Sequence, residues 1–181
     1  MKTKDIAFIG IMAALLCIAG PLSVPVGPVP LSLASFAVYL AGAVLGWKKG
    51  TAAVAIYLLI GLAGVPVFSG FSGGFPKLAG VTGGYLIGYL FCAAVTGLSV
   101  RKPLPDGRRR AAVRMALFMA AGTVVLYAFG TAWFVIQTGR TLGAALGLCV
   151  LPFLPGDTVK IAAAVLAAGP IRSALKNSAV S

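Results

Sequence analysis

Apolar residues form long runs along this chain, separated by short groups of cations or by stretches rich in proline and glycine. A helix needs roughly 20 mainly apolar residues to cross a bilayer. The stretch from Ile6 to Trp47 carries no charge, but the prolines within 21–30 divide it, because proline removes a backbone donor and favours extended chain. The pattern predicts transmembrane helices at about 5–20, 31–46, 51–64, 81–99, 112–136 and 156–172.

The composition supports a membrane protein. The 181 residues are 60% hydrophobic and 10% charged, and the mean hydropathy is +1.03. A soluble domain has roughly 25% charged residues. We therefore expect an all-α membrane protein: a compact bundle of six transmembrane helices that forms one domain over 1–181. Its first apolar run has the form of a signal peptide, but further runs follow, so we expect it to be retained as the first helix.

The cations predict the orientation. Of the fifteen lysines and arginines, twelve lie in the N-terminal segment, the 47–49 loop, the 101–114 loop and the C-terminal segment. This placement follows the positive-inside rule, and it predicts that both termini are cytoplasmic. The net charge of +12 is therefore explained without nucleic acid, which we do not expect as a partner. The proline loop, the 65–80 loop and the start of the last helix would then face outward.

Enzyme and metal chemistry have little support in the sequence. Histidine is absent, and the three cysteines, Cys17, Cys92 and Cys149, are isolated within apolar runs, so we expect no metal and no cofactor. No phosphate-binding loop of the GxxxxGK[ST] type occurs, nor an HExxH or GxSxG motif. A ladder of intramembrane carboxylates and an inverted repeat are also missing, although self-powered transporters often have them. The pattern favours a binding subunit that depends on partners for energy.

Asp157 and Lys160 are the first candidates for ligand contact. Three residues apart at the start of the last apolar run, they would share one helix face. A charge costs about 2.5–3.5 kcal/mol at the centre of a membrane helix and less toward its ends. Two interpretations remain open at this point: the pair contacts a polar ligand, or it only neutralises itself.

The glycine-rich and aromatic segment 65–80 supplies further candidates. Aromatic rings such as Phe75 offer flat apolar walls, hydroxyls offer polar contacts, and glycines permit close backbone approach. The ligand best suited to such a site is small and partly apolar, with N–H groups and an acid. The simpler alternative to a ligand-contacting loop is that the aromatic residues lie at the membrane interface and the glycines only make the loop flexible. The candidate ligand-contacting residues are Asp157, Lys160, Tyr85, Phe68, Phe71, Ser72, Gly73 and Thr82.

Three segments, Gly64–Gly74, Gly80–Tyr85 and Leu151–Lys160, carry a resemblance to a known family. They read GVPVFSGFSGG, GVTGGY and LPFLPGDTVK, and together they resemble the BioY family. This family comprises the biotin-specific substrate-binding (S) components of energy-coupling factor (ECF) transporters. One departure is Val81, where the family usually has proline; the change removes no polar contact.

The resemblance implies a six-helix S component in the membrane lipid of a prokaryotic cell, which captures biotin from outside. A transmembrane coupling protein and a pair of cytoplasmic ATPases would drive uptake, although some members are reported to work without a dedicated module. The resemblance also implies that Asp157 and Lys160 form the polar pair at the biotin site, and that 64–74 and Tyr85 line or cover it. The small residues Gly10 and Ala14 would face the coupling protein.

Biotin suits the residue types. We expect Asp157 to accept hydrogen bonds from the ureido N–H groups and aromatic rings to pack on the bicycle. Lys160 would face either the ureido carbonyl or the carboxylate of the tail, and the sequence leaves both open. Two other functions also remain open: an S component for thiamine or riboflavin, and a structural or regulatory membrane protein without a transport role.

Overall fold

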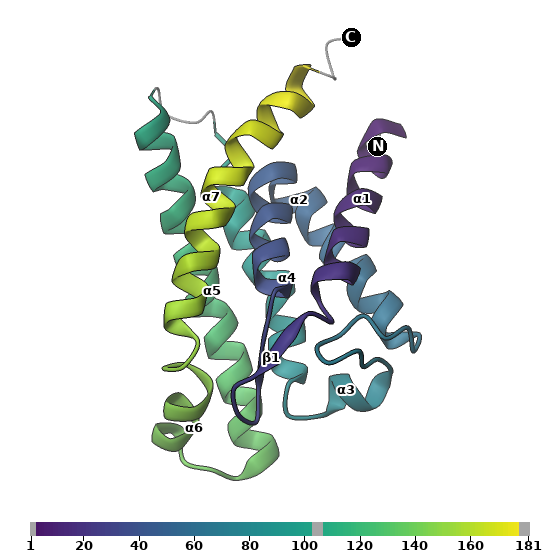
Figure 1. Ribbon diagram of the computed structural model, residues 1–181, viewed down its shortest axis with the longest axis vertical. Coiled ribbons are helices and arrows are strands. Elements are labelled where there is room, and N and C mark those ends of the chain that lie inside the picture. Colours follow the sequence, from purple (N-terminus) through teal and green to yellow (C-terminus); the bar gives the residue numbers. More distant parts are fainter. Residues whose placement is uncertain (1–2, 103–106, 178–181) are drawn as a thin grey trace.

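The computed structural model describes residues 3–102 and 107–177, and it is mostly helical (Figure 1). Parts of the N-terminal segment, of the expected 101–114 loop and of the C-terminal segment lie outside these residues. The helices are α1 Thr3–Ala19, α2 Ala34–Leu62, α3 Phe75–Ala79, α4 Gly83–Leu98, α5 Arg108–Thr138, α6 Leu142–Cys149 and α7 Leu154–Asn177. The strands are β1 Ser23–Pro25 and β2 Pro30–Ser32.

Helix α2 contains a sharp bend at Gly46. There φ is 80° and ψ is 174°, a backbone conformation that glycine adopts at little steric cost. The two arms fold back on each other, since a Cβ at Gly50 would lie 2.6 Å from the carbonyl oxygen of Ala41. The expected 47–49 loop is therefore wrong: Lys48 and Lys49 lie on the helix directly after a one-residue bend.

Three helices in the described part of the chain are long and apolar enough to cross a membrane: Ala34–Leu62, Arg108–Thr138 and Leu154–Leu175. Helix α4 is apolar but shorter. Helix α5 begins at Arg108, so the second half of the expected 101–114 loop is helical. The chain is thus a multi-pass, mainly helical membrane protein.

The proline-rich segment 21–30 forms part of a β-hairpin rather than a simple extended loop. β1 and β2 pair antiparallel, with Ser23 opposite Ser32, and Gly27 in the turn has a φ of 139°. The hairpin, α3 and α6 gather at one end of the bundle, whereas the start of α1 and the end of α7 lie at the other (Figure 1). The two ends therefore differ in character: one holds irregular segments and the other holds helix termini.

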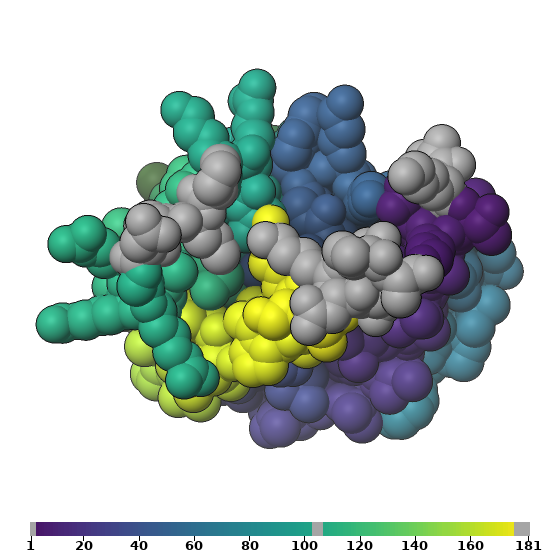
Figure 2. Space-filling model, turned by 90° about the horizontal axis from the view of Figure 1, so that it is seen from above, coloured from purple at the N-terminus to yellow at the C-terminus, as the bar shows by residue number. Residues whose placement is uncertain are grey.

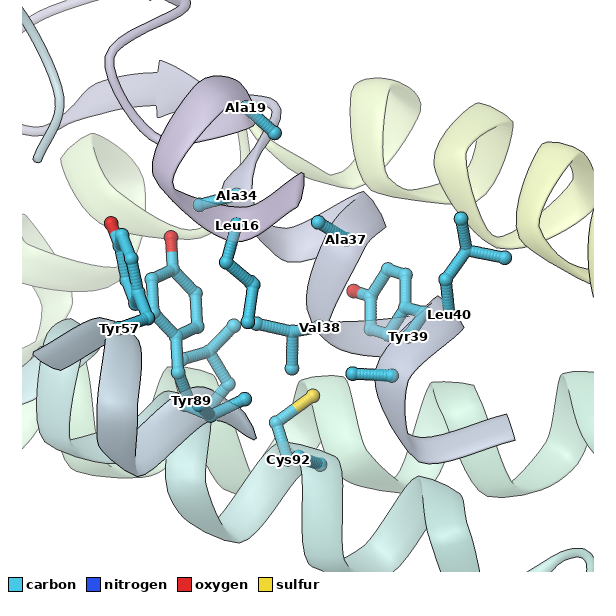
Figure 3. Packing of buried hydrophobic residues seen from close by; sticks show 14 of the residues in the cluster. Leu16, Ala19, Ala34, Ala37, Val38, Tyr39, Leu40, Tyr57, Tyr89 and Cys92 are labelled. Atoms are coloured by element: carbon cyan, nitrogen blue, oxygen red, sulfur yellow. The ribbon is translucent and has the colours of Figure 1, made fainter. Parts of the chain in front are cut away.

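The centre of the bundle is built from α1, α2 and α4. Figure 3 shows Leu16, Val38, Tyr39 and Cys92 turned toward one another, and each is buried. Glycine allows these helices to approach closely, since a Cβ at Gly42 would lie 2.7 Å from the carbonyl oxygen of Ala93. This packing fixes the helix ends that surround the candidate site.

Candidate functional site

A small cavity of about 50 Å³ lies among the hairpin and helices α2, α4, α5 and α7. Its wall is aromatic and aliphatic, with a polar patch on one side. Four tyrosines line it: Tyr57, Tyr85, Tyr89 and Tyr127. The charged groups in its wall are Asp157 and Lys160, both from the first turns of α7.

Asp157 and Lys160 form a buried ion pair. Their residues are only 5% and 8% exposed, and Lys160 Nζ lies 3.0 Å from Asp157 Oδ1. The ammonium also donates to the carbonyl oxygen of Ser32 at 2.7 Å and to Ser35 Oγ at 3.0 Å. An ammonium has three donors, so all three are used within the protein. A buried pair of this kind is stable only when such additional hydrogen bonds satisfy it.

The carboxylate of Asp157 accepts hydrogen bonds at both oxygens. Ser35 Oγ donates to Oδ1 at 3.2 Å, beside the Lys160 contact. Tyr127 donates its hydroxyl to Oδ2 at 2.6 Å, from the facing helix α5. Bonds of this type to an ionised acceptor are the strong ones in proteins. The polar patch therefore joins α2, α5 and α7 through one carboxylate.

Local sequence explains why these groups meet. Asp157 lies in the first turn of α7, where a negative charge interacts favourably with the helix dipole, and Pro155 fits the same turn. Ser32 Oγ donates to the carbonyl oxygen of Gly20 and accepts from the backbone N–H of Ala34. These two hydrogen bonds hold Ser32 in place, and its carbonyl oxygen accepts from Lys160.

The remaining wall is provided mainly by aromatic side chains. Tyr85 is buried, and its hydroxyl donates to the carbonyl oxygen of Cys149 at 3.3 Å. Tyr57 and Tyr89 lie side by side (Figure 3). Thr82 Oγ1 is buried and has no hydrogen-bond partner among residues 3–102 and 107–177. A buried hydroxyl without a partner in a cavity wall is suited to a polar group of a ligand.

Of the eight predicted ligand-contacting residues, four line this cavity: Asp157, Lys160, Tyr85 and Thr82. The structure does not bring the other four into its wall: Phe68, Phe71, Ser72 and Gly73. The segment that contains these four contributes Ser69 instead. The charged pair and the start of α4 thus meet as one site, to which the glycine-rich loop adds Ser69.

Packing within the loop explains the positions of its side chains. Phe68 is fully buried and meets Tyr57 edge-on, with ring centroids 5.5 Å apart. Phe71 is 69% exposed and Phe75 is 68% exposed, so neither ring forms a wall. Ser72 Oγ bonds within the loop, to the carbonyl oxygen of Ser69.

Gly73, the remaining loop candidate, lies against the backbone of Val65, where a side chain would clash. The two predicted partner-contacting residues lie elsewhere. Gly10 and Ala14 are exposed on α1 and do not line the cavity. The loop therefore needs its glycine for its own packing, and the small face of α1 is separate from the cavity.

Sequence reasoning missed Ser32, Ser35 and three of the tyrosines, Tyr57, Tyr89 and Tyr127. The chain has five tyrosines, and four of them line the cavity. A signal was present, because these tyrosines interrupt otherwise apolar runs, and a buried tyrosine hydroxyl usually finds a partner. The serines carried no such signal, since Ser32 ends a strand of the hairpin and a single serine such as Ser35 is common in a membrane helix.

Comparisons with known proteins agree on one family. The BioY family model matches residues 1–177. A probable biotin transporter BioY of Pyrococcus horikoshii is 39% identical over 168 residues, which cover 93% of this chain and 96% of that protein. The biotin transporter BioY of Thermotoga maritima is 38% identical, with 88% of this chain and 90% of that protein covered.

A solved structure is similar over almost the whole chain. It is described as the crystal structure at 2.1 Å of the S-component for biotin from an ECF-type ABC transporter. The TM-score is 0.82 at 30% sequence identity, and the match covers 97% of this chain and 95% of that chain. From the family match and these relatives, the chain described here belongs to the BioY family.

Proposed function

We propose that this chain is the biotin-binding S component of an ECF-type vitamin uptake transporter. Its relatives are named as biotin transporters, and the similar solved structure is an S-component for biotin. The observation that carries the proposal is the buried Asp157–Lys160 pair in the wall of a tyrosine-lined cavity. The protein binds and carries a solute and is not an enzyme, as is typical of this family.

Biotin matches the chemistry of the cavity wall. Its ureido group has two N–H donors and a carbonyl, its bicycle and tail are apolar, and the tail ends in a carboxylate. The ureido N–H groups donate to Asp157, and the tyrosine rings pack on the bicycle. Because Lys160 already uses three donors, a carbonyl or carboxylate oxygen of biotin replaces the carbonyl of Ser32 or the hydroxyl of Ser35.

Thr82 and Tyr85 are the remaining ligand contacts in this proposal. The hydroxyl of Thr82, which has no partner among the described residues, takes a polar group of biotin, and Tyr85 adds an apolar wall. Phe68 acts indirectly, by holding the loop against Tyr57. Phe71, Ser72 and Gly73 belong to the loop beside the site, and in this proposal they do not touch the ligand.

The proposed topology has six spans, at about 5–20, 31–46, 51–64, 81–99, 112–136 and 156–172, with both termini cytoplasmic. The two arms of α2 count as separate spans. Figure 2 supports this arrangement: the start of α1, the bend of α2, the start of α5 and the end of α7 lie together at one end. These are the cation-rich segments, as the positive-inside rule requires of a cytoplasmic face. The cavity then opens toward the outer face.

The proposed partners are a transmembrane coupling protein and a pair of cytoplasmic ATPases. The sequence has no phosphate-binding loop, so ATP hydrolysis has to come from another chain. On α1, Gly10 and Ala14 are exposed, and a Cβ at Gly10 would meet nothing within 4 Å. Small exposed residues four positions apart allow another membrane helix to approach closely.

Calorimetric titration of the purified protein tests this function. We expect tight binding of biotin and no competition from thiamine or riboflavin. Asp157→Asn and Lys160→Ala each weaken biotin binding, because truncating one partner of a buried charged pair costs roughly 2–5 kcal/mol. Thr158→Ala is the matched control, since Thr158 is exposed on the same turn and its hydroxyl donates to the carbonyl oxygen of Leu154 in its own helix. Equal binding by all three variants would show that the site is elsewhere.

A further inference from the structure

A second concave site lies at the other end of the molecule, between the start of α5 and the end of α7. This groove has a volume of about 770 Å³. Arg108 and Arg109 line it from α5, and Arg172 lines it from α7. Residues of the biotin cavity and of α1 do not contribute to it. The groove is therefore separate from both surfaces that the proposed transport function uses.

The floor of the groove is apolar. Ala112 and the buried Met115 come from α5, and Val165, Leu166 and Gly169 come from α7. The two helices lean apart toward this end (Figure 1). Pro170 contributes to the opening, because proline within a helix removes a backbone hydrogen bond and bends the helix. The resulting depression has the volume and the lining of a site for a hydrocarbon chain.

The rim of the groove carries positive charge, from Arg108, Arg109 and Arg172. The first turn of α5 has arginines and no acidic residue, and its N-cap, Gly107, has no side chain that could cap the helix. Cations are unfavourable at this end of a helix, where the dipole already favours an anion. Within residues 3–102 and 107–177, no carboxylate lines the groove.

Arg172, which also lines the groove, has an unsatisfied donor. Its Nη1 donates to the carbonyl oxygen of Ala43 at 3.2 Å, which holds the side chain against α2. Its Nε is buried and has no hydrogen-bond partner in the part of the chain that the structure describes. Arginine recognises phosphate oxygens through such paired N–H groups. The arginines of the rim are therefore suited to bind an anion with several oxygens.

We propose that this groove binds an anionic phospholipid. Its phosphate lies among Arg108, Arg109 and Arg172, and one acyl chain lies along the floor between α5 and α7. A free phosphate would use the rim and leave the apolar floor exposed, whereas a phospholipid uses both. The groove is at the cation-rich end, and anionic lipids are enriched in the cytoplasmic leaflet, where basic pockets between helices bind their headgroups.

Native mass spectrometry of the delipidated full chain tests the proposal. The probes are dioleoylphosphatidylglycerol, dioleoylphosphatidylcholine and glycerol 1-phosphate. We expect one phosphatidylglycerol to bind at least about tenfold tighter than phosphatidylcholine, and glycerol 1-phosphate not to displace it. Arg108→Gln with Arg109→Gln weakens this binding about thirtyfold, from the usual contribution of two cations at an anionic lipid surface.

Two further variants separate the groove from general surface charge. Arg101→Gln with Lys102→Gln removes the same charge from a neighbouring exposed segment, and it leaves lipid binding within about twofold. Gly169→Leu keeps every charge but fills the floor; a Cβ there has open space, so the fold tolerates it. We expect it to weaken phosphatidylglycerol binding as strongly as the arginine pair does.

The lipid-binding measurements can support the phospholipid proposal or overturn it. Equal binding of the two phospholipids, or equal losses in the two double variants, would overturn the proposal and leave only diffuse charge. Displacement by glycerol 1-phosphate would reduce the site to a phosphate site without an acyl chain. Biotin binding and thermal unfolding, measured on every variant, report folding independently. If Gly169→Leu does not fold, the comparison of the two double variants decides alone.

Discussion

The Asp157–Lys160 pair can be tested with two nearly isosteric substitutions and their combination. Asp157→Asn removes the negative charge, Lys160→Met removes the positive charge, and the double variant removes both. If the pair only neutralises itself, removing both charges restores what either single substitution loses. If the pair binds biotin, removing both charges restores stability but not binding.

The structure gives the size of each effect. Lys160→Met removes hydrogen bonds of 2.7, 3.0 and 3.0 Å and leaves Asp157, only 5% exposed, as a charge without a counterion. Breaking a buried pair in this way costs roughly 3–5 kcal/mol of folding free energy. The double variant leaves neutral groups with lost hydrogen bonds, which costs roughly 1–3 kcal/mol. The two substitutions should therefore be strongly coupled.

Thermal unfolding in detergent and calorimetric biotin titration measure the two effects on the same samples. We expect the double variant to unfold at a higher temperature than Lys160→Met, yet to bind biotin at least about thirtyfold more weakly than wild type. The control pair is Asp5→Asn with Lys49→Met, which removes a partly exposed ion pair between α1 and α2. This control variant should change the unfolding temperature and biotin binding only slightly. Biotin binding of wild-type strength in the double variant would refute the ligand assignment.

Two further substitutions test the cavity wall, and a third tests the loop beside it. Tyr127→Phe removes a hydrogen bond to Asp157, so it should weaken biotin binding about tenfold in a titration, whereas Tyr39→Phe, whose hydroxyl pairs with Thr123, should not. Thr82→Val removes a buried hydroxyl without a partner in the described chain, so it should weaken biotin binding and leave the melting temperature unchanged or higher. Gly61→Ala inserts a methyl group where the ring of Phe68 packs, and it should lower stability by roughly 1–3 kcal/mol in thermal unfolding. Unchanged stability there would mean that the loop is not held by this ring.

The helical segments could be predicted because burial in a membrane leaves a strong pattern. An apolar run ends where a cation or a proline occurs, so the approximate position of a helix follows from hydropathy alone. The bend of α2 was misjudged for a physical reason. Lysine side chains can reach the interface from a helix, so Lys48 and Lys49 do not require a loop. Only Gly46, with its positive φ, had to leave the helical conformation.

The hairpin could not be predicted from its own residues. Four prolines indicated extended chain, but pairing of Ser23 with Ser32 depends on contacts outside the segment. Ser32 is fixed by the carbonyl oxygen of Gly20 and by Lys160, which is 128 residues away. Such long-range contacts leave no periodic signal in the sequence. The hairpin therefore became evident only with the helices around it.

The charged residues of the site could be predicted better than its aromatic residues, because a charge beside an apolar run is stronger evidence for a ligand site than an aromatic ring is. A charged pair next to an apolar run costs free energy in the membrane, so few explanations other than a functional role account for it. Phenylalanines in a glycine-rich loop have many alternatives, and here Phe68 packs the loop while Phe71 faces outward. Tyrosines within helices resemble packing or interfacial residues, and their common orientation toward one cavity depends on tertiary structure.

The two interpretations of the charged pair are compatible once its hydrogen bonds are counted. A charge buried at this depth needs partners whether or not a ligand is bound, since an unpaired buried ion costs several kcal/mol. Asp157 and Lys160 satisfy each other, and Ser35 bonds to both. A ligand that enters the cavity therefore exchanges one partner for another instead of meeting a bare charge. Self-neutralisation is thus a condition for such a pair to bind a ligand, and binding should be decided by how well biotin replaces the hydrogen bonds that it displaces.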